Sequence, residues 1–208
     1  MSAPERSPAL LNVIDVEATC WDGPAPAPSE IIEIGLCVVD VRARKRVESD
    51  RILVRPVRSR VSAFCTELTG LTQEEVDTGL EFREACAELV RRHGVADRRW
   101  ASWGDYDRKQ FARQYDADGV DYPFPPRHVN AKRVFAEAHG VRQRGMARAL
   151  EYAGLPLEGR HHSGLDDAWN IAVLVLYLMD RGDWPTARGG AVPPRDEALR
   201  GEAARGRG

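Results

Sequence analysis

The sequence contains no long hydrophobic run. A membrane-spanning helix needs about 20 consecutive apolar residues, and no stretch of these 208 residues approaches that length. Residues 1–11 also lack the apolar core of a signal peptide, because Pro4, Glu5 and Pro8 interrupt them. These absences argue against a membrane protein and predict a cytoplasmic one.

Cysteine is scarce and scattered. The chain has 4 cysteines, with no C-x-x-C pair and no histidine at zinc-finger spacing. Their positions argue against a zinc finger or a disulfide framework. We expect four reduced thiols, of which Cys37, inside an apolar run, acts as a small hydrophobic side chain.

An excess of charge of either sign is also missing. Lys and Arg number 30 and Asp and Glu number 32, which gives a net charge of −2. A protein that coats long nucleic-acid duplexes usually has a basic face or a high pI. The balance argues against such a protein, but it leaves open one that contacts only a few phosphates.

The sequence does contain strand patterns first and interleaved helix patterns afterwards. Apolar and β-branched runs predict strands over residues 10–16, 30–41, 46–54 and 98–103. Apolar residues at helical spacing predict helices over residues 81–92, 107–115, 131–139, 144–153 and 164–180, with short helical turns within 62–78. This order predicts an α/β fold, a mixed β-sheet flanked by α-helices. Ser163 is expected to cap the last helix.

One domain accounts for most of the chain. A length of 208 residues fits a single domain, and we expect it to cover residues 10–182 after a flexible N-terminus at 1–9. Residues 183–208 are rich in Arg, Gly, Ala, Pro and Glu and contain few large apolar side chains. That composition is typical of a disordered tail.

Two carboxylates lie at the end of the first predicted strand. Asp15 and Glu17 are two positions apart, so on a strand their side chains point to the same side. Two like charges so close are unfavourable unless a cation lies between them, and Mg²⁺ and Mn²⁺ prefer oxygen ligands of this kind. The alternative is a strand end that carries two solvated acids.

A second acidic motif, SWGDYD, spans residues 102–107. A strand runs into a glycine there, and an acid begins the next helix. Asp105 and Asp107 are both candidates, and Asp107 is preferred because an aromatic residue precedes it and the helix continues from it. Either residue, taken alone, is equally typical of a helix N-cap.

The third motif, HHSGLDD, spans residues 161–167. It places His162 in a loop five residues before Asp167, which lies in the first turn of a helix. An imidazole that titrates near neutrality can act as a general base, and Asp167 can supply a further metal-binding carboxylate. The alternative is that Asp166 and Asp167 only complement the helix dipole. His161 is expected to face solvent.

Taken in order, these motifs are more specific than any one of them. Asp15, Glu17, Asp107 and Asp167, with His162, resemble the signature of the DEDDh exonucleases. The resemblance implies a ribonuclease H-like mixed sheet flanked by helices.

The likeness extends over residues 12–180. Within the superfamily the chain looks most like the Eri-1/three-prime histone exonuclease group and its KapD-like relatives. The stretches that carry this likeness are IDVEATCW, EIIEIG, LVRPVRSRVSAFCTELTGLTQEEVD and HHSGLDDAWNIA.

The resemblance implies a metal-dependent 3′→5′ exonuclease. Such an enzyme releases nucleoside 5′-monophosphates from single-stranded RNA or DNA 3′ ends, and the likeness favours RNA. It implies two divalent cations, Mg²⁺ or Mn²⁺, held by Asp15, Glu17, Asp107 and Asp167, with Asp15 bridging both. His162 would deprotonate the attacking water.

The resemblance also suggests residues around the substrate. Ala18 and Thr19 would approach the terminal nucleotide by their backbone, and Phe64 and Leu71 would flank its base. Ordinary core packing is an equal alternative for Phe64 and Leu71.

Three other functions remain open from the sequence. One is a DNA-directed repair exonuclease, and another is a metal phosphatase that acts on small nucleotides. The third is a catalytically idle nucleic-acid-binding or adaptor protein on the same fold. An idle protein is expected to lack one acid or the histidine, and all five positions are occupied here.

Overall fold

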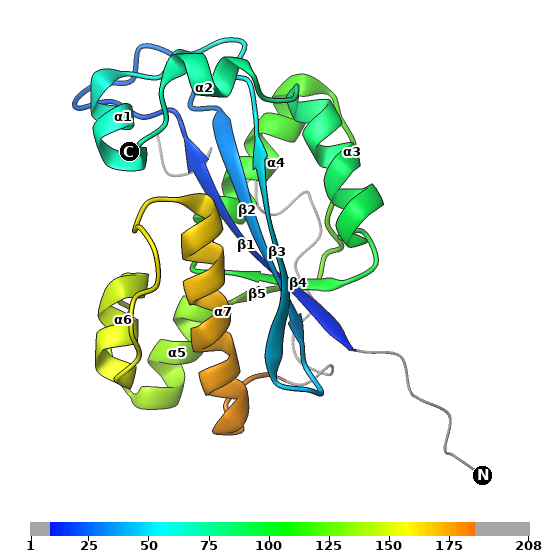
Figure 1. The fold of residues 1–208 in the computed structure, drawn as a ribbon, viewed down its shortest axis with the longest axis vertical. Coiled ribbons are helices and arrows are strands. Elements are labelled where there is room, and N and C mark those ends of the chain that lie inside the picture. The colour runs from blue at the N-terminus through cyan, green and yellow to red at the C-terminus, as the bar shows by residue number, and fades with distance from the viewer. Residues whose placement is uncertain (1–8, 186–208) are drawn as a thin grey trace, which may run out of the picture.

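The computed structural model describes residues 9–185, which form a mixed sheet covered by helices (Figure 1). The strand order is β3-β2-β1-β4-β5. β1 is antiparallel to β2, β2 is antiparallel to β3, and β4 and β5 run parallel to β1. The strands are β1 (Leu10–Ala18), β2 (Ile31–Asp40), β3 (Lys45–Leu53), β4 (Arg99–Ser102) and β5 (His128–Asn130). The predicted α/β class is confirmed.

Helices cover both faces of the sheet. α5, α6 and α7 pack on one face, α3 and α4 pack on the other, and α1 and α2 lie at one end of β1 and β2 (Figure 1). The helices are α1 (Ala63–Thr69), α2 (Gln73–Asp77), α3 (Phe82–His93), α4 (Tyr106–Asp118), α5 (Ala131–His139), α6 (Met146–Ala153) and α7 (Gly164–Asp180). None of the helices in this described part combines the length and the hydropathy needed to span a bilayer.

The alternation of β1 decides where its acids point. Leu11 and Val13 lie in the apolar cluster under α7, whereas Ile14 and Val16 lie in the cluster on the opposite face. Successive strand residues alternate between faces. The two acids of β1 occupy odd positions, like Leu11 and Val13, and therefore point to the face that α7 covers. The strand therefore directs two carboxylates toward the beginning of that helix.

A close backbone contact holds α7 on the sheet. A Cβ at Gly35 of β2 would lie 1.8 Å from the carbonyl oxygen of Gly164, the first residue of α7. No side chain fits between the two segments, so both positions allow an approach that only glycine permits. This contact fixes how far α7 stands from β1 and β2.

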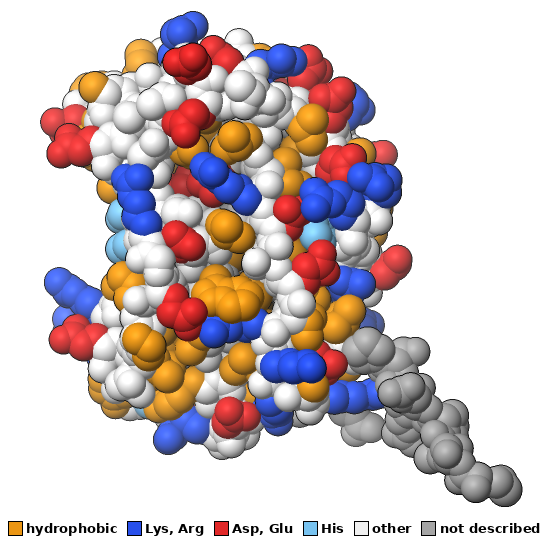
Figure 2. Space-filling view, in the orientation of Figure 1, with side chains coloured by type: hydrophobic (Ala, Val, Ile, Leu, Met, Phe, Trp, Pro, Cys, Tyr) orange, Lys and Arg blue, Asp and Glu red, His pale blue; other side chains and the backbone are white. Residues whose placement is uncertain are grey.

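The surface over α7 and β3 has mixed charge. Figure 2 shows acidic and basic side chains interspersed on this face, in the orientation of Figure 1. This side of the molecule therefore presents no continuous basic surface, in keeping with the net charge of −2.

The structure corrects several predicted boundaries. β1 continues two residues beyond the prediction, so both acids lie within the strand. The three-residue β5 was missed, and Ser163 makes no side-chain capping bond to α7. The helices predicted over 131–139 and 164–180 are confirmed, as are the four free cysteines.

The domain also extends past the predicted boundary at residue 182. Trp184 packs against the cluster under α7, and Arg99 donates to the carbonyl oxygen of Pro185. The predictions of a flexible N-terminus and a disordered tail otherwise fall on residues 1–8 and 186–208, which lie outside the described residues.

Candidate active site

Three carboxylates converge between β1 and α7. Asp15 and Glu17 come from β1, and Asp167 comes from the first turn of α7. One oxygen from each of the three lies within 4.8 Å of the others, a spacing that allows them to share a metal ion. The packing of α7 on the sheet therefore brings together acids that lie about 150 positions apart in the sequence.

Asp107 joins this cluster from the other side of β1. It lies in the first turn of α4, is buried, and its Oδ1 accepts a hydrogen bond from the backbone N–H of Val16 at 3.1 Å. Asp105 instead occupies the N-cap position of α4, and its carboxylate accepts a bond from Asn130 Nδ2 at 3.0 Å. Of the two acids in the second motif, the structure brings Asp107 to the cluster.

The four acids repel one another in a poorly solvated place. Burial, followed by the charges of Asp107 and Asp167, raises the pKa of Asp15 well above its usual value. Burial and the charge of Asp167 raise the pKa of Glu17 to about 8. Burial also raises the pKa of Asp107, to about 6, although its hydrogen bond from Val16 lowers it.

The two acids of β1 have no direct partner among the described residues. Within residues 9–185, neither Asp15 nor Glu17 accepts a hydrogen bond or forms an ion pair through its carboxylate, although the charge of Arg160 acts to lower the pKa of Glu17. Crowded, poorly solvated carboxylates without partners are costly, and a divalent cation with oxygen ligands removes that cost. The donor set thus fits hard divalent cations such as Mg²⁺ or Mn²⁺.

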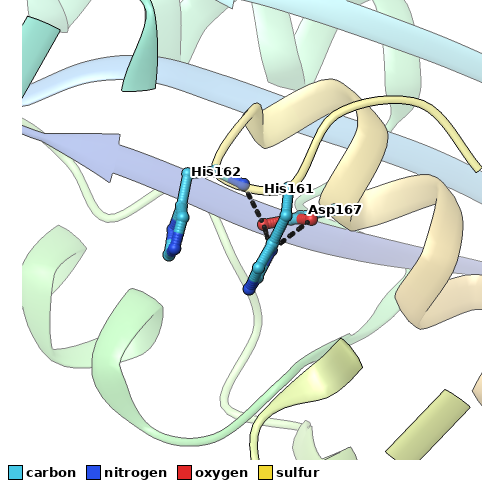
Figure 3. A group of neighbouring side chains, drawn as sticks. All are labelled: His161, His162 and Asp167. Carbon is cyan, nitrogen blue, oxygen red and sulfur yellow. Dashed lines mark hydrogen bonds and ion pairs between the residues drawn. The ribbon is translucent and has the colours of Figure 1, made fainter. Parts of the chain in front are cut away.

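His162 lies at the rim of the cluster in an unusual backbone conformation. Its φ is +65°, a left-handed value that is uncommon for residues other than glycine. This turn directs the His162 N–H to Asp167 Oδ2 at 3.0 Å (Figure 3). Burial, and then the neighbouring His161, lowers the pKa of the His162 imidazole, so the ring is neutral and able to accept a proton near pH 7.

The prediction that His161 faces solvent is only partly right, because its side chain is 39% exposed but also contacts the site. Its Nδ1 lies 3.0 Å from Asp167 Oδ2, and its ring stacks on that of His162 with centroids 4.0 Å apart (Figure 3). The two histidines and Asp167 also place ligand atoms within 4.8 Å of one another. Nothing in the HHSGLDD motif distinguishes the two rings, because their orientation depends on the turn at His162.

Comparison with known proteins agrees with this geometry. Residues 13–175 match the exonuclease (RNase_T) family. The chain belongs to the exonuclease family.

Two curated relatives are 3′–5′ exonucleases. Snipper, a 3′–5′ exonuclease of Drosophila melanogaster, is 28% identical over 198 residues, which cover 84% of this chain and 70% of the relative. The 3′–5′ exoribonuclease 1 of Rattus norvegicus is 30% identical over 184 residues, which cover 83% of this chain and 53% of the relative. The chain therefore spans about half the length of the rat protein.

A solved structure gives the same family and fold. The nuclease domain of 3′hExo, a DEDDh family member bound to rAMP, superposes with a TM-score of 0.77 at 26% identity. The match covers 85% of this chain and 94% of that chain. Together these matches make the chain a 3′–5′ exonuclease by class and confirm the ribonuclease H-like fold.

Two predicted substrate contacts of the exonuclease do not fit the structure. The backbone N–H of Thr19 donates to the carbonyl oxygen of Glu30 at 2.8 Å, and its own carbonyl accepts from Ser29 Oγ at 2.7 Å. Thr19 is 1% exposed, has no free N–H for a nucleotide, and keeps only one lone pair on its carbonyl oxygen. Leu71 is only 2% exposed and packs with Ile32 and other core side chains. It therefore follows the alternative of core packing and not of contact with a base.

Phe64 and Ala18 are the other two predicted substrate contacts. Phe64 of α1 is 39% exposed, and α1 is tied to the chain after β1 by Ser62 Oγ, which donates to the carbonyl oxygen of Cys20 at 2.6 Å. Ala18 ends β1 directly after Glu17 and is 6% exposed. A contact of either residue with a nucleotide stays a prediction.

The sequence analysis missed Tyr106 and Glu33. Tyr106 directly precedes Asp107 and is 52% exposed. Partial burial is the main cause that raises the pKa of its phenol, and the charge of Glu17 raises it further. An exposed aromatic beside the third acid was the available signal. Glu33 was read only as part of a strand, although its charge also raises the pKa of Asp15 and of Glu17.

Proposed function

We propose that this exonuclease is metal-dependent and removes nucleotides from single-stranded 3′ ends, with RNA favoured over DNA, as nucleoside 5′-monophosphates. The observation that supports it most is the cluster of Asp15, Glu17 and Asp167, whose oxygens lie within 4.8 Å of one another. Acids at this spacing, of which Asp15 and Glu17 have no hydrogen-bond partner among the described residues, fit a cation site, and a neutral histidine at the rim fits a general base.

The four acids would hold two divalent cations. Asp15, central among them, would contact both, Glu17 and Asp167 would complete the site nearer His162, and Asp107 would act through bound water. When bound, the cations supply positive charge that stabilises the attacking water and the leaving 3′ oxygen. We leave open whether Mg²⁺ or Mn²⁺ serves.

His162 would accept the proton of the attacking water at a ring nitrogen. Its lowered pKa keeps the ring neutral at the pH where this is needed. The hydrogen bond from the His162 backbone N–H to Asp167 fixes the turn that carries the imidazole ring. The proton leaves the water as the oxygen attacks phosphorus, and the bond to the 3′ oxygen breaks.

The choice of RNA follows from the relatives. The rat relative is named an exoribonuclease. A solved structure with a similar fold concerns the 3′-end specific recognition of a histone mRNA stem-loop by a 3′-exonuclease. A single-stranded end is needed because a base that remains stacked in a duplex cannot enter a narrow site. A cytoplasmic location stays a prediction.

The test is digestion of matched 5′-labelled RNA and DNA oligomers with Mg²⁺, Mn²⁺ or EDTA. Wild type is compared with Asp15→Ala and His162→Ala, and chromatography identifies the released product. We expect a ladder that shortens from the 3′ end only with metal, is lost in both variants, forms faster on RNA and yields 5′-monophosphates. Wild type that shortens neither strand in either metal would contradict the proposal and favour the idle binding protein.

A further inference from the structure

Glu33 lies beside the acid cluster but has a different setting. It is the ladder partner of Glu17 in the β1–β2 pair, so both side chains stand on the α7 face. It is 1% exposed. Unlike Glu17, it has a cationic partner, because its Oε1 accepts a bond from Arg51 Nε of β3 at 2.8 Å.

The Glu33 carboxylate is placed beneath the first turn of α7. Its Oε1 is 3.4 Å from the backbone nitrogen of Leu165, and a Cβ at Gly164 would lie 3.3 Å from its Cδ and Cγ. Helix N-termini carry unpaired N–H groups and partial positive charge, which acids stabilise. Ser163 makes no capping bond, and Glu33 of β2 adds its charge to the two acids of the first turn, Asp166 and Asp167.

The same terminus carries two of the five proposed catalytic groups. Asp167 lies in the first turn of α7, and His162 lies two residues before the helix. Two others, Asp15 and Glu17, belong to β1. Any shift of the α7 terminus relative to the sheet changes the distance between these two pairs.

We infer that Glu33, held by Arg51, is a positioning residue that docks the start of α7 and so sets His162 and Asp167 against the acids of β1. The inference rests on the proposed function of that site. The second oxygen of Glu33, Oε2, is buried without a hydrogen-bond partner among the described residues. An unpaired carboxylate oxygen beside Glu17 also favours a cation there, even though Arg51 offsets the charge of Glu33.

Glu158, in the loop between α6 and α7, offers a control. It accepts from Arg46 of β3 at 3.0 Å and from Trp169 Nε1 of α7 at 2.8 Å. It thus links α7 to β3 through an arginine, but beyond the first turn of the helix. Because Glu158 is 43% exposed and Glu33 is 1% exposed, a role in stability alone predicts a fall in melting temperature in both variants, larger for Glu33, with kcat per folded molecule unchanged.

The experiment compares Glu33→Gln with Glu158→Gln in the full chain. We expect Glu33→Gln to lower kcat roughly tenfold or more, with KM changed less than about twofold, and to weaken Mn²⁺ binding in calorimetry by a similar factor. Glu158→Gln should lower the melting temperature without either effect. Equal losses in both variants, or a Glu33→Gln protein with kcat and Mn²⁺ affinity within about twofold of wild type, would overturn the inference.

A third variant and a metal-free readout keep the test decisive. Arg51 is 42% exposed, so Arg51→Gln is expected to fold even if Glu33→Gln does not, with a smaller loss in the same direction. In metal-free protein, the NMR signals of the His162 ring should move in Glu33→Gln and stay in place in Glu158→Gln. If wild type degrades no oligomer, the proposed function fails, while unmoved His162 signals in Glu33→Gln would separately reject the positioning role.

Discussion

Two sets of acids near the end of β1 are treated in opposite ways. Glu30, just before β2, is 1% exposed, and its carboxylate accepts bonds from the N–H groups of Val57, Arg58 and Ser59 at 3.1, 2.8 and 2.6 Å. It also receives the Ser59 hydroxyl at 2.7 Å and pairs with the Arg58 guanidinium at 3.3 Å. Every lone pair of this carboxylate is used.

Asp15 and Glu17 have none of these partners. Both have raised pKa values because burial and neighbouring acids disfavour their charged forms. A protein that satisfies Glu30 so fully has the means to satisfy two more acids nearby. The difference indicates that the β1 acids are kept free for a ligand that is not part of the chain.

The largest expected effect is that of Asp15→Asn. Loss of a carboxylate central to the cation site should lower the exonuclease rate by about a thousandfold, equivalent to roughly 4 kcal/mol of transition-state stabilisation. The same change removes a buried, repelled charge, so metal-free protein at pH 8 should melt at a higher temperature than wild type. Oligomer digestion and thermal unfolding measure the two effects. A lower melting temperature would contradict the contrast between the β1 acids and Glu30.

Two neighbouring histidines allow a second contrast. His162→Ala should lower kcat by roughly 10²- to 10⁴-fold, the usual contribution of a general base. His161→Ala removes a ring that pairs with Asp167 but has no proposed proton-transfer role, so its loss should be tenfold or less by the same scale. Steady-state rates with Mn²⁺ decide between them, and equal losses would contradict the assignment of the base.

Glu30→Ala should have the opposite sign in stability. It leaves the N–H groups that converge on the carboxylate without an acceptor, which should lower the free energy of unfolding by roughly 3 kcal/mol. The rate per folded molecule should fall far less than in Asp15→Asn, because Glu30 does not line the acid cluster. Urea unfolding gives the stability, and active-site titration with Mn²⁺ gives the folded fraction.

Asp107→Asn tests an intermediate case. Asp107 accepts one bond from Val16, and its pKa is raised only to about 6. An asparagine oxygen can still accept that bond, so the melting temperature should change less than in Asp15→Asn. The rate should fall by roughly 10- to 100-fold, as for groups that act on a metal through water, and a larger loss than that of Asp15→Asn would reverse the proposed order.

The sequence predicted well what depends on local pattern. The helices over 131–139 and 164–180 have strong apolar periodicity and clear stop signals, and the structure places them there. The acids of β1 could be paired because a strand alternates its faces. The exonuclease signature placed Asp107 and Asp167 on separate helices, and the structure brings both to β1.

Features that depend on tertiary contacts could not be predicted in this way. β5 has three residues, too few for a pattern. Whether Leu71 meets a base or the core depends on how α1 and α2 pack, and His161 turns to Asp167 because of the φ at His162. Glu33 looked like any strand residue, since its place beneath the start of α7 depends on how that helix docks on the sheet.

The most direct test of the account is thermal unfolding of metal-free wild type and Glu17→Gln across pH. The pKa of Glu17 rises from 4.5 when unfolded to about 8 when folded, so the folded state binds more protons between these values. Wild-type stability should therefore fall as pH rises through that window, with the loss complete above it. Glu17→Gln should show a shallower fall, and Mn²⁺ at pH 8 should raise the melting temperature of wild type but much less that of the variant. Identical pH profiles with no response to Mn²⁺ would contradict the claim that these acids are a cation site.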